Sequence, residues 1–555
     1  MNRSRKQSGI IFAGIIFAFV VIAAIILGVV MKSASTAAEN EAKGKTLEQL
    51  LQRVSYTTAE PVKGAIEFSD GNLYDELPEI TKYPIAVQGR GQVDIEIFTS
   101  GEKAGANQDS WLIDMAEAFN RQNNTTASGK TISLTVRSVG SGLAADYILS
   151  GKYLPDLYTP SNQLFGDYAI ANGADMELYL ERLVGNTAGI LVKKNLNYNS
   201  VDDVLNAVMN SQLNLGYTNP QNSATGINLL IYLLQSNGGV DSQQAHDALS
   251  KFNNNIPFVA YTTQQMTVSA ANGSLDAIVS EYQAYTNDSN LKDLYNFIPF
   301  GVRHDNPVYL VNPNSKSVDE KEAISQILEY LTGSQAQSAA KNKGFNYNDD
   351  YKSSYTTYGA ETGRALQVYK RAKDSGKDII AMFVADCSGS MNGAAILQLK
   401  ESLSNGIQYI NENNYIGLIS YSTTVTLELP LAPFDLNQKS YFQGAINGLQ
   451  ASGNTSTYEA LCVAMDLVLK AKESNPNAKC MIFLLSDGQA NGSYRLRDIQ
   501  AALQDTTIPV YTIAYTDSAD TNELQALSNI NEAAAIKADS DDIVYQIKSL
   551  FNSQL

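Results

Sequence analysis

The stretch IIAMFVADCSGSM, residues 379–391, decides how the carboxy-terminal part of the chain folds. Its opening run IIAMFVA is apolar throughout, which is typical of a central parallel strand buried on both faces. Asp386, Ser388 and Ser390 follow at positions i, i+2 and i+4, and Gly389 permits a tight turn. Open α/β sheets bind ligands beyond the carboxyl ends of such strands. The spacing therefore predicts one carboxylate and two hydroxyls that point at a common position.

Two later segments are expected to complete this site. SGNTSTYEAL (452–461) supplies Thr455 from a glycine-containing loop before a helix. The apolar strand KCMIFLLS ends at Ser486 and is followed by Asp487, a second carboxylate at a strand end. A hard divalent cation prefers oxygen ligands, and Mg²⁺ prefers them in near-octahedral array. These oxygens together predict a Mg²⁺ site.

The pattern resembles the von Willebrand factor type A domain and its metal-ion-dependent adhesion site, over about residues 376–555. The resemblance implies a doubly wound α/β fold with a mostly parallel sheet. It also implies Mg²⁺ or Mn²⁺ held by five residues, Asp386, Ser388, Ser390, Thr455 and Asp487. In that family the sixth ligand is usually a Glu or Asp carboxylate from a protein partner, so such a partner is expected here.

The charge count agrees with that expectation, because two carboxylates neutralise a divalent ion and hydroxyls add no negative charge. The ion can then accept an anionic oxygen at an open coordination position. The alternative interpretation is that these residues cap helices and hold a metal that meets no partner.

Residues 93–345 are predicted to form a second α/β domain, because strand and helix patterns alternate there. VDIEIFTS (93–100) and TISLTVRSV (131–139) alternate as strands do. SWLIDMAEAFNRQ (110–122) has an apolar stripe at helical spacing, and Trp111, which lies in it, is expected in the core. A further helix is expected over 323–344.

Hydroxyl and amide residues precede several of these helices, where backbone N–H groups and the helix dipole favour an anion. The segments resemble extracellular solute-binding proteins, nearest the molybdate-binding-like branch of the periplasmic type II fold. That family closes two lobes on a small ligand, often an oxyanion, so a small anionic solute is expected. The resemblance gives six ligand candidates: Ser100, Ser141, Asn219, Ser223, Thr225 and Tyr282.

One departure from that family lies in the loop Thr99–Lys103. The carboxylate of Glu102 would repel an oxyanion unless Lys103 or a cation offsets its charge. Each Ser before a helix also has a second interpretation, since serine is a good N-cap. The domain is then a retained fold that serves as an interaction platform. Neither His246 nor His304 has a neighbour in sequence that indicates chemistry.

The amino terminus predicts a membrane anchor. Arg3, Arg5 and Lys6 precede the uncharged run 9–31, whose 23 residues would reach about 34 Å as a helix, enough for a bilayer core of about 30 Å. The basic flank predicts that residues 1–8 stay in the cytoplasm and that the rest lies outside the cell. A cleaved signal peptide is the alternative. Residues 32–92 are expected to be an extended stalk, and 346–375 a linker with a lead-in helix.

Composition narrows the function classes. The 40 basic and 57 acidic residues give a net charge of −17, which argues against nucleic-acid binding. No base, nucleophile or cofactor motif indicates an enzyme, and the three cysteines are expected to be free thiols or, for Cys462 and Cys480, a disulfide. The order of domains resembles a class of bacterial cell-surface proteins. We expect a membrane-tethered extracellular binding protein; the alternative is a solute-binding component that serves a transporter or sensor and docks through its type A domain.

Overall fold

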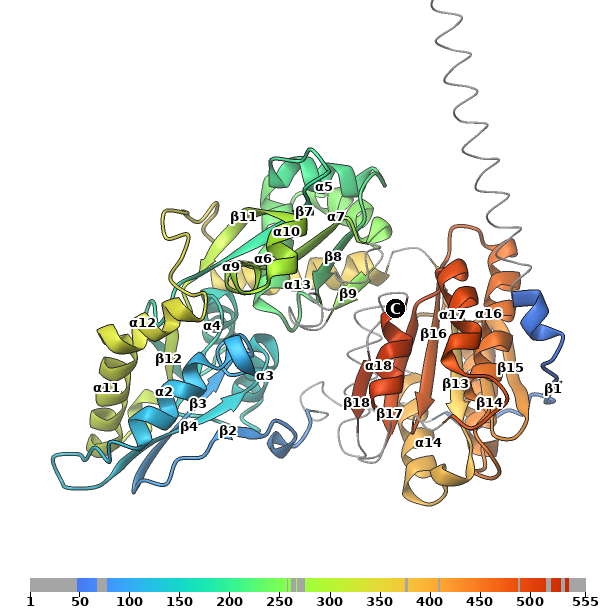
Figure 1. Ribbon diagram of the computed structural model, residues 1–555, viewed down its shortest axis with the longest axis horizontal. Helices are drawn as coiled ribbons and strands as arrows, with labels where there is room; N and C mark the ends of the chain where they lie inside the picture. The colour runs from blue at the N-terminus through green and yellow to red at the C-terminus, as the bar shows by residue number, and fades with distance from the viewer. Residues whose placement is uncertain are drawn as a thin grey trace, which may run out of the picture.

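The computed structural model describes residues 47–66, 77–256, 258–260, 266, 275–374, 378–407, 410–487, 490–515, 521–530 and 535–538. They form two α/β parts that lie side by side (Figure 1). The predicted cytoplasmic tail 1–8 and anchor 9–31 lie outside the described residues. Within those ranges, no helix has both the length and the apolar character needed to cross a membrane.

The carboxy-terminal part contains a seven-stranded sheet in the order β1-β15-β14-β13-β16-β17-β18. Every neighbouring pair in it is parallel except β14 and β15. Its strands are β1 (Tyr56–Thr58), β13 (Ile379–Asp386), β14 (Tyr415–Tyr421), β15 (Val425–Pro433), β16 (Lys479–Ser486), β17 (Val510–Tyr515) and β18 (Ala535–Ala538). Its helices are η5 (Gly389–Met391), α14 (Ala394–Gly406), α15 (Leu436–Gly448), α16 (Thr457–Ser474), α17 (Leu496–Thr506) and α18 (Thr521–Asn529).

Helices cover both faces of this sheet, as the apolar run in β13 predicts. Ile380, Met382 and Val384 belong to the core cluster formed with α16, α17 and α18. The alternate residues of β13 belong to the cluster formed with α14 and α15, where the rings of Phe383 and Phe442 lie 5.5 Å apart. The sheet is therefore doubly wound and mostly parallel.

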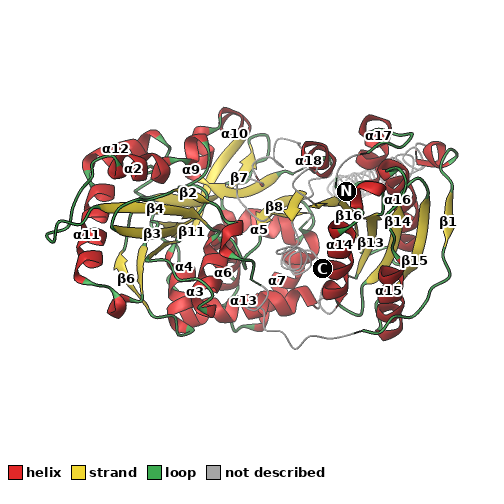
Figure 2. Ribbon diagram, turned by 90° about the horizontal axis from the view of Figure 1, so that it is seen from below, coloured by secondary structure: helices red, strands yellow, loops and turns green. Residues whose placement is uncertain are grey.

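The two-lobed part contains two smaller sheets (Figure 2). Lobe 1 has the order β2-β4-β3-β5-β12-β6 and lobe 2 the order β11-β7-β10-β8-β9. The elements of lobe 1 are η2 (Ile80–Lys82), β2 (Ile85–Val87), β3 (Val93–Thr99), η3 (Asn107–Asp109), α2 (Trp111–Asn120), β4 (Ile132–Ser138), α3 (Ser141–Ser150), β5 (Leu157–Thr159), α4 (Gln163–Ala171), β6 (Met176–Leu180), β12 (Val308–Val311), η4 (Pro313–Ser315), α11 (Val318–Thr332) and α12 (Ser334–Asn342). Those of lobe 2 are β7 (Asn186–Lys193), α5 (Val201–Met209), β8 (Leu215–Thr218), α6 (Ala224–Ser236), α7 (Gln243–Asn255), β9 (Phe258–Ala260), β10 (Ala277–Glu281), α9 (Tyr282–Asn287), α10 (Ser289–Leu294) and β11 (Tyr295–His304).

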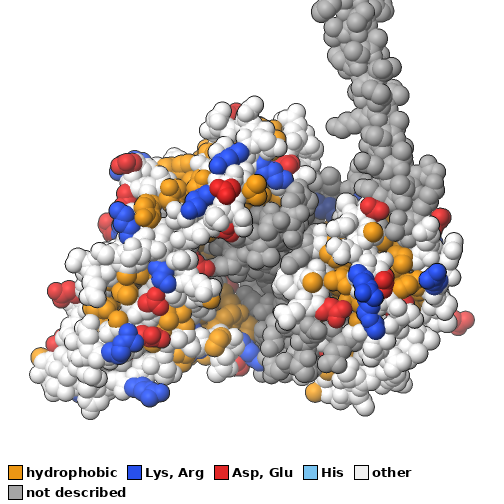
Figure 3. Space-filling view, in the orientation of Figure 1, with side chains coloured by type: hydrophobic (Ala, Val, Ile, Leu, Met, Phe, Trp, Pro, Cys, Tyr) orange, Lys and Arg blue, Asp and Glu red, His pale blue; other side chains and the backbone are white. Residues whose placement is uncertain are grey.

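The strands expected over 93–100 and 131–139 and the helix expected over 110–122 form as β3, β4 and α2. The single helix expected over 323–344 is instead two helices, α11 and α12, separated at Gly333, whose backbone is extended. Trp111 is fully buried, as expected, and its indole Nε1 donates to the carbonyl of Ala336 at 2.9 Å. The sheet of lobe 1 joins parallel and antiparallel strands, because β12 returns from lobe 2 and pairs antiparallel with β5 and β6. On the face seen in Figure 3, basic and acidic side chains are interspersed over the described surface.

The predicted stalk 32–92 is wrong over its described residues, which belong to the two folded parts. Residues 47–51 are helical, and the buried Leu47 packs into the core beneath α16 and α17. β1 follows and pairs parallel with β15 at the edge of the seven-stranded sheet, Tyr56 opposite Val425. Further on, β2 pairs with β4 in lobe 1. The Pro and Gly residues that suggested a linker instead mark the turns between these short elements.

The predicted lead-in helix forms, but it packs on the two-lobed part and not on the carboxy-terminal part. Residues 346–358 and helix α13 (Gly359–Asp374) pack on the two-lobed part, where α13 contacts α4, α6 and α7. Tyr369 of α13 is buried there and accepts a hydrogen bond at 3.3 Å from Tyr217 Oη. The polar Tyr-rich sequence suggested a linker, but Tyr351 and Tyr355 are partly buried and donate hydrogen bonds to Gly301 O and Asn228 Oδ1 at 2.8 and 2.7 Å. Tyr347 and Tyr358 are exposed.

These two corrections define how the parts are connected. The chain forms β1 of the seven-stranded sheet, then the whole two-lobed part, and then the other strands of the same sheet. The two-lobed part is therefore inserted after the first described strand of the carboxy-terminal part. The two parts also meet where Lys479 Nζ donates to the carbonyl of Asn253 at 2.7 Å.

Candidate functional site

The first candidate site lies at the carboxyl edge of the seven-stranded sheet. β13 and β16 are parallel neighbours, with Ala385 opposite Leu485, so Asp386 ends its strand beside Ser486. Ser486 Oγ donates to Asp386 Oδ2 at 2.6 Å. Tyr421 Oη, at the end of β14, donates to the same oxygen at 3.1 Å. Three adjacent strand ends thus fix the Asp386 carboxylate.

The two serines predicted to act with Asp386 lie beside it. The backbone N–H of Ser388 donates to Asp386 Oδ1 at 2.9 Å, which holds the turn after the strand. Ser388 Oγ and Ser390 Oγ are 3.0 Å apart, Ser390 being part of η5. The i, i+2, i+4 spacing therefore brings one carboxylate and two hydroxyls together, as the sequence predicts.

The loop that carries Thr455 is hydrogen-bonded to the loop that carries the two serines. The N–H of Ser452 donates to the carbonyl of Cys387 at 2.8 Å, and the N–H of Gly389 donates to the carbonyl of Gly453 at 3.0 Å. Thr455 is buried, and its N–H donates to Asn491 Oδ1 at 2.7 Å. Asp487 directly follows β16, next to Ser486.

The charges at this edge fit a divalent cation. Burial raises the pKa of Asp386 above its ordinary value, and the negative charge of Asp487 adds to the rise, against hydrogen bonds from Ser486 and Ser388. The three groups that donate to Asp386 are neutral, so none of them compensates its charge. A cation held by two carboxylates and neutral hydroxyls would do so, and oxygen ligands of this kind suit Mg²⁺. Metal binding itself stays a prediction.

Hydroxyl groups are essential to any such metal site. Over the described ranges, no group of three His, Cys, Asp or Glu side chains could hold a metal ion. The three thiols, Cys387, Cys462 and Cys480, are free, and burial raises the pKa of Cys387 to about 12, which disfavours the thiolate that binds metals.

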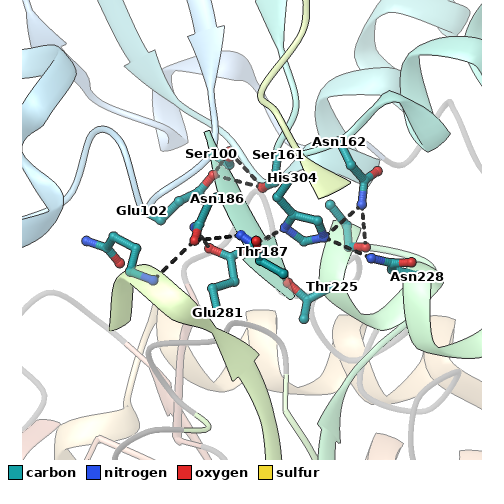
Figure 4. A network of polar contacts seen from close by, with 12 residues as sticks. Ser100, Glu102, Ser161, Asn162, Asn186, Thr187, Thr225, Asn228, Glu281 and His304 are labelled. Carbon is teal, nitrogen blue, oxygen red and sulfur yellow. Dashed lines mark hydrogen bonds and ion pairs between the residues drawn. The ribbon is translucent and has the colours of Figure 1, made fainter. Parts of the chain in front are cut away.

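The second candidate site lies between the lobes, and its lobe 1 side is built around Glu102. Ser100 Oγ and Ser161 Oγ donate to Glu102 Oε1 at 2.6 and 2.8 Å (Figure 4). Lys103 Nζ lies 2.9 Å from the same oxygen. Burial opposes ionisation of Glu102, but attraction to Lys103 and the hydrogen bonds outweigh it and lower its pKa to about 2. Lys103 thus offsets the negative charge of Glu102, which is one of the two possibilities that the sequence left open.

The lobe 2 side is built around a second buried carboxylate, Glu281, at the end of β10. Asn186 Nδ2 donates to Glu281 Oε2 at 2.9 Å, and Thr225 Oγ1 donates to Oε1 at 3.1 Å. His304 Nδ1 lies 2.7 Å from Glu281 Oε1 (Figure 4). The sequence near His304 gave no sign of this contact, because Glu281 lies 23 positions away and folding brings it to the histidine.

The hydrogen-bond network assigns the neutral form to His304. Its Nε2 faces the Nδ2 groups of Asn162 and Asn228 at 3.0 and 3.2 Å. Both amides are oriented by their oxygens, which accept from the N–H groups of Leu164 and Val302, so each Nδ2 is a donor. His304 Nε2 is then an acceptor, and Nδ1–H donates a hydrogen bond to Glu281 Oε1. Asn186, Thr225 and His304 are thus three donors to the Glu281 carboxyl group.

The predicted ligand residues have local roles in this arrangement. Ser100 and Thr225 donate to the protein's own carboxylates. Ser223 caps α6 by accepting from the N–H of Gly226 at 3.3 Å. Ser141 Oγ accepts from the N–H of Ser161 at 3.4 Å. Tyr282 packs against Phe297, with ring centres 5.0 Å apart.

The helix ends expected to hold an oxyanion are also engaged. The N–H of Gly142, in the first turn of α3, donates to the carbonyl of Asn222 in lobe 2 at 3.0 Å. Asn219 Oδ1 accepts from the N–H of Gln221 at 3.0 Å. The loop of lobe 2 at 219–222 thus lies against α3, and the two lobes contact each other where the anion was predicted.

A cleft of about 400 Å³ remains open between the lobes. Four acidic residues line it, Glu102, Asp109, Glu281 and Asp288. Gln283 also lines it, and its Nε2 donates to Asp109 Oδ1 at 2.8 Å, which joins lobe 2 to lobe 1. Of the functional residues here, Glu281, His304, Asn186 and Gln283 were missed; the one sequence signal was that Glu281 ends a strand.

Two family models match the chain. Residues 104–346 match the bacterial extracellular solute-binding protein family, and residues 381–551 match the von Willebrand factor type A domain. The chain therefore combines a solute-binding-like domain with a type A domain.

Among curated proteins, the chain is similar to inter-alpha-trypsin inhibitor heavy chain H3 from Bos taurus, with 29% identity over 173 residues, which are 29% of this chain and 19% of that protein. The match thus spans about a fifth of that relative. A solved periplasmic thiamin binding protein has 14% identity and a TM-score of 0.40, covering 52% of this chain and 98% of its own. A von Willebrand factor type A protein from Catenulispora acidiphila has 17% identity and a TM-score of 0.30, covering 32% and 42%.

Proposed function

We propose that this chain, which joins a solute-binding-like domain to a type A domain, is a membrane-tethered extracellular binding protein that recognises a protein partner through a divalent metal. Asp386, Ser388, Ser390, Thr455 and Asp487 would hold the ion, Mg²⁺ or Mn²⁺. The ion would supply an open coordination position for a Glu or Asp carboxylate of the partner.

The Asp386 carboxylate carries this proposal. It is buried and has a raised pKa, its donors are neutral, and two serine hydroxyls lie beside it. A buried charge is costly unless it is compensated, and a bound cation is one compensation. The remaining roles of the chain's own groups are to orient that carboxylate, through Tyr421 and Ser486, and to hold the Thr455 loop against the serines.

Isothermal titration of the full-length chain with MgCl₂ tests the metal site. The native chain should bind Mg²⁺, Asp386→Ala should lose binding, and Asp466→Asn should keep it. Asp466 is a matched control because it is a partly buried carboxylate of α16 that already pairs with Lys470. Equal Mg²⁺ binding by Asp386→Ala and the native chain would refute the site.

Capture of a partner from native membranes, with Mg²⁺ or with chelator, tests the second half of the proposal. A protein retained by the native chain in Mg²⁺ but not in chelator, and not by Asp386→Ala, is the expected result. Identical retention under both conditions would show that recognition does not need the metal.

A second candidate function is a solute-binding component of a transporter or sensor, in which the type A domain serves for docking. The cleft between the lobes favours it, because a two-lobed domain with a cleft of about 400 Å³ has the size of a small-molecule site. In either function the solute-binding-like domain is a ligand clamp, or an interaction platform if its cleft binds nothing. A small anionic solute is the ligand that the resemblance favours.

A further inference from the structure

The charge of the interlobe cleft, defined by its lining residues Glu102, Asp109, Glu281 and Asp288, opposes an anionic ligand. Among the described residues that line it there is no Lys or Arg. The Lys103 ammonium offsets the charge of Glu102, but the Lys103 side chain is completely buried and is not among the residues that line the cleft. Glu281 is surrounded by neutral donors, because His304 donates from its neutral form. Lys343 Nζ lies at the edge of the cleft, where it donates to the carbonyl of Asn107 at 2.7 Å. Four carboxylates and two lysines leave the cleft with a net negative charge.

A separate observation indicates a ligand that donates hydrogen bonds. Gln283 is 1% exposed and lines the cleft. Its Nε2 is used by Asp109, while its Oε1 has no hydrogen-bond partner among the described residues. A buried carbonyl oxygen without a donor is costly in a folded protein, so a donor on a bound ligand would satisfy it.

The size and lining of the cleft indicate which class of cation it can bind. At about 400 Å³ it is much larger than one metal ion, and no metal-binding group of His, Cys, Asp or Glu is found over the described ranges. No aromatic side chain is among its described lining residues, which disfavours a quaternary ammonium held over ring faces. A primary ammonium offers three donors and forms strong charge-assisted hydrogen bonds with carboxylates.

We infer that the cleft binds a small aliphatic cation with two or more amino groups. Asp109 on lobe 1 and Glu281 and Asp288 on lobe 2 place acceptors on both walls, so one such molecule would join the lobes. Gln283 Oε1 would accept a further ammonium hydrogen bond. This inference rests on the clamp part of the proposed function and is independent of the metal site.

The test is isothermal titration of the full-length chain with spermidine, putrescine, sodium sulfate and sodium molybdate, in chelator. We expect saturable spermidine binding that weakens with added NaCl, and no oxyanion binding. Asp109→Asn and Asp288→Asn should each weaken spermidine binding about tenfold, the loss expected for one charge-assisted contact. Asn is also a good N-cap, so Asp288→Asn keeps the cap of α10.

Two control substitutions separate amine binding in the cleft from a general effect of removing charge and from Mg²⁺ binding at Asp386. Asp293→Asn removes an acidic group from the same helix α10 but outside the cleft lining, and should leave spermidine binding unchanged. Asp386→Ala should also leave it unchanged, even if Mg²⁺ binding is lost. Sulfate or molybdate binding without amine binding would overturn the charge inference and keep the clamp. Binding of none of the four probes would overturn both.

Discussion

Glu102 and Asp386 are both buried carboxylates near the carboxyl ends of parallel strands, and the fold treats them in opposite ways. Lys103 and two serine hydroxyls hold Glu102 ionised, with its pKa lowered to about 2. Asp386 has neutral donors and a raised pKa. A carboxylate with a built-in counter-charge is part of the folded framework. One without it is available to a cation from outside.

Of the substitutions that test this difference, removal of Lys103 should lower the free energy of unfolding the most. Lys103→Met leaves Glu102 buried without its counter-charge, so we expect a loss of about 3–5 kcal/mol in the free energy of unfolding of the solute-binding-like domain. Trp111 is the only tryptophan and is buried in lobe 1, so its fluorescence during urea unfolding reports this domain.

A second substitution and a control sharpen that result. Glu102→Gln in the Lys103→Met background should recover most of the loss, because the buried charge is gone. Lys292→Met, at an exposed position of α10, should change stability by less than about 0.5 kcal/mol. If Lys103→Met and Lys292→Met behaved alike, the built-in compensation of Glu102 would be disproved.

Leu47→Ala should have the next largest effect, and on the other domain. Leu47 is 4% exposed in the core beneath α16, so its truncation should lower stability by about 2–4 kcal/mol. All three cysteines lie in the type A domain, so the rate of thiol labelling in urea reports its unfolding. Labelling should occur at lower urea, with the Trp111 transition unchanged. Val62→Ala, at a position 67% exposed, is the control. Unchanged labelling would return residues 47–66 to the role of a stalk.

Asp386→Asn should have the smallest effect on stability and the clearest dependence on pH. Because the folded-state pKa of Asp386 is raised, its carboxylate destabilises the fold above that pKa, and this penalty disappears as the pH falls below the ordinary value of 3.8. In chelator at pH 7 the variant should therefore be more stable than the native chain. The difference should vanish below about pH 4.

With Mg²⁺ at pH 7 the native chain should instead be more stable than Asp386→Asn, because only the native chain gains stability by binding the ion. The measurement is the urea midpoint of thiol labelling with Mg²⁺ and with chelator, by a pyridyl disulfide reagent, which reacts with thiols at pH 4 as well as at pH 7. A variant less stable than the native chain in chelator, by the same amount at pH 7 and pH 4, would show that the Asp386 charge is not the cause.

The type A domain was largely predictable because its signals are contiguous. An apolar run, a turn glycine and three polar residues at fixed spacing occupy positions 379–391, and the strand and turn form there as expected. The residues that orient Asp386 were not predictable. Tyr421 and Ser486 lie 35 and 100 positions away and are brought to it only by the pairing of parallel strands.

The cleft was less predictable because its contacts are distant in sequence. Ser100 and Thr225 were identified as polar groups facing the cleft, but Thr225 donates to a carboxylate 56 positions away. His304 meets Asn228 and Asn162, which are 76 and 142 positions from it. β1 was missed because YTT is short and exposed, with none of the alternation that marks a half-buried strand.

The insertion of the two-lobed part has a consequence for proteolysis. The chain joins it to the type A domain at both of its ends, so a single cut in one connection leaves the other intact. After a cut between α13 and β13, only non-covalent contacts hold the type A core to the amino-terminal piece. These include the β1–β15 pairing and the packing of Leu47. The strength of these contacts would then determine whether the type A core dissociates from the amino-terminal piece or stays bound to it.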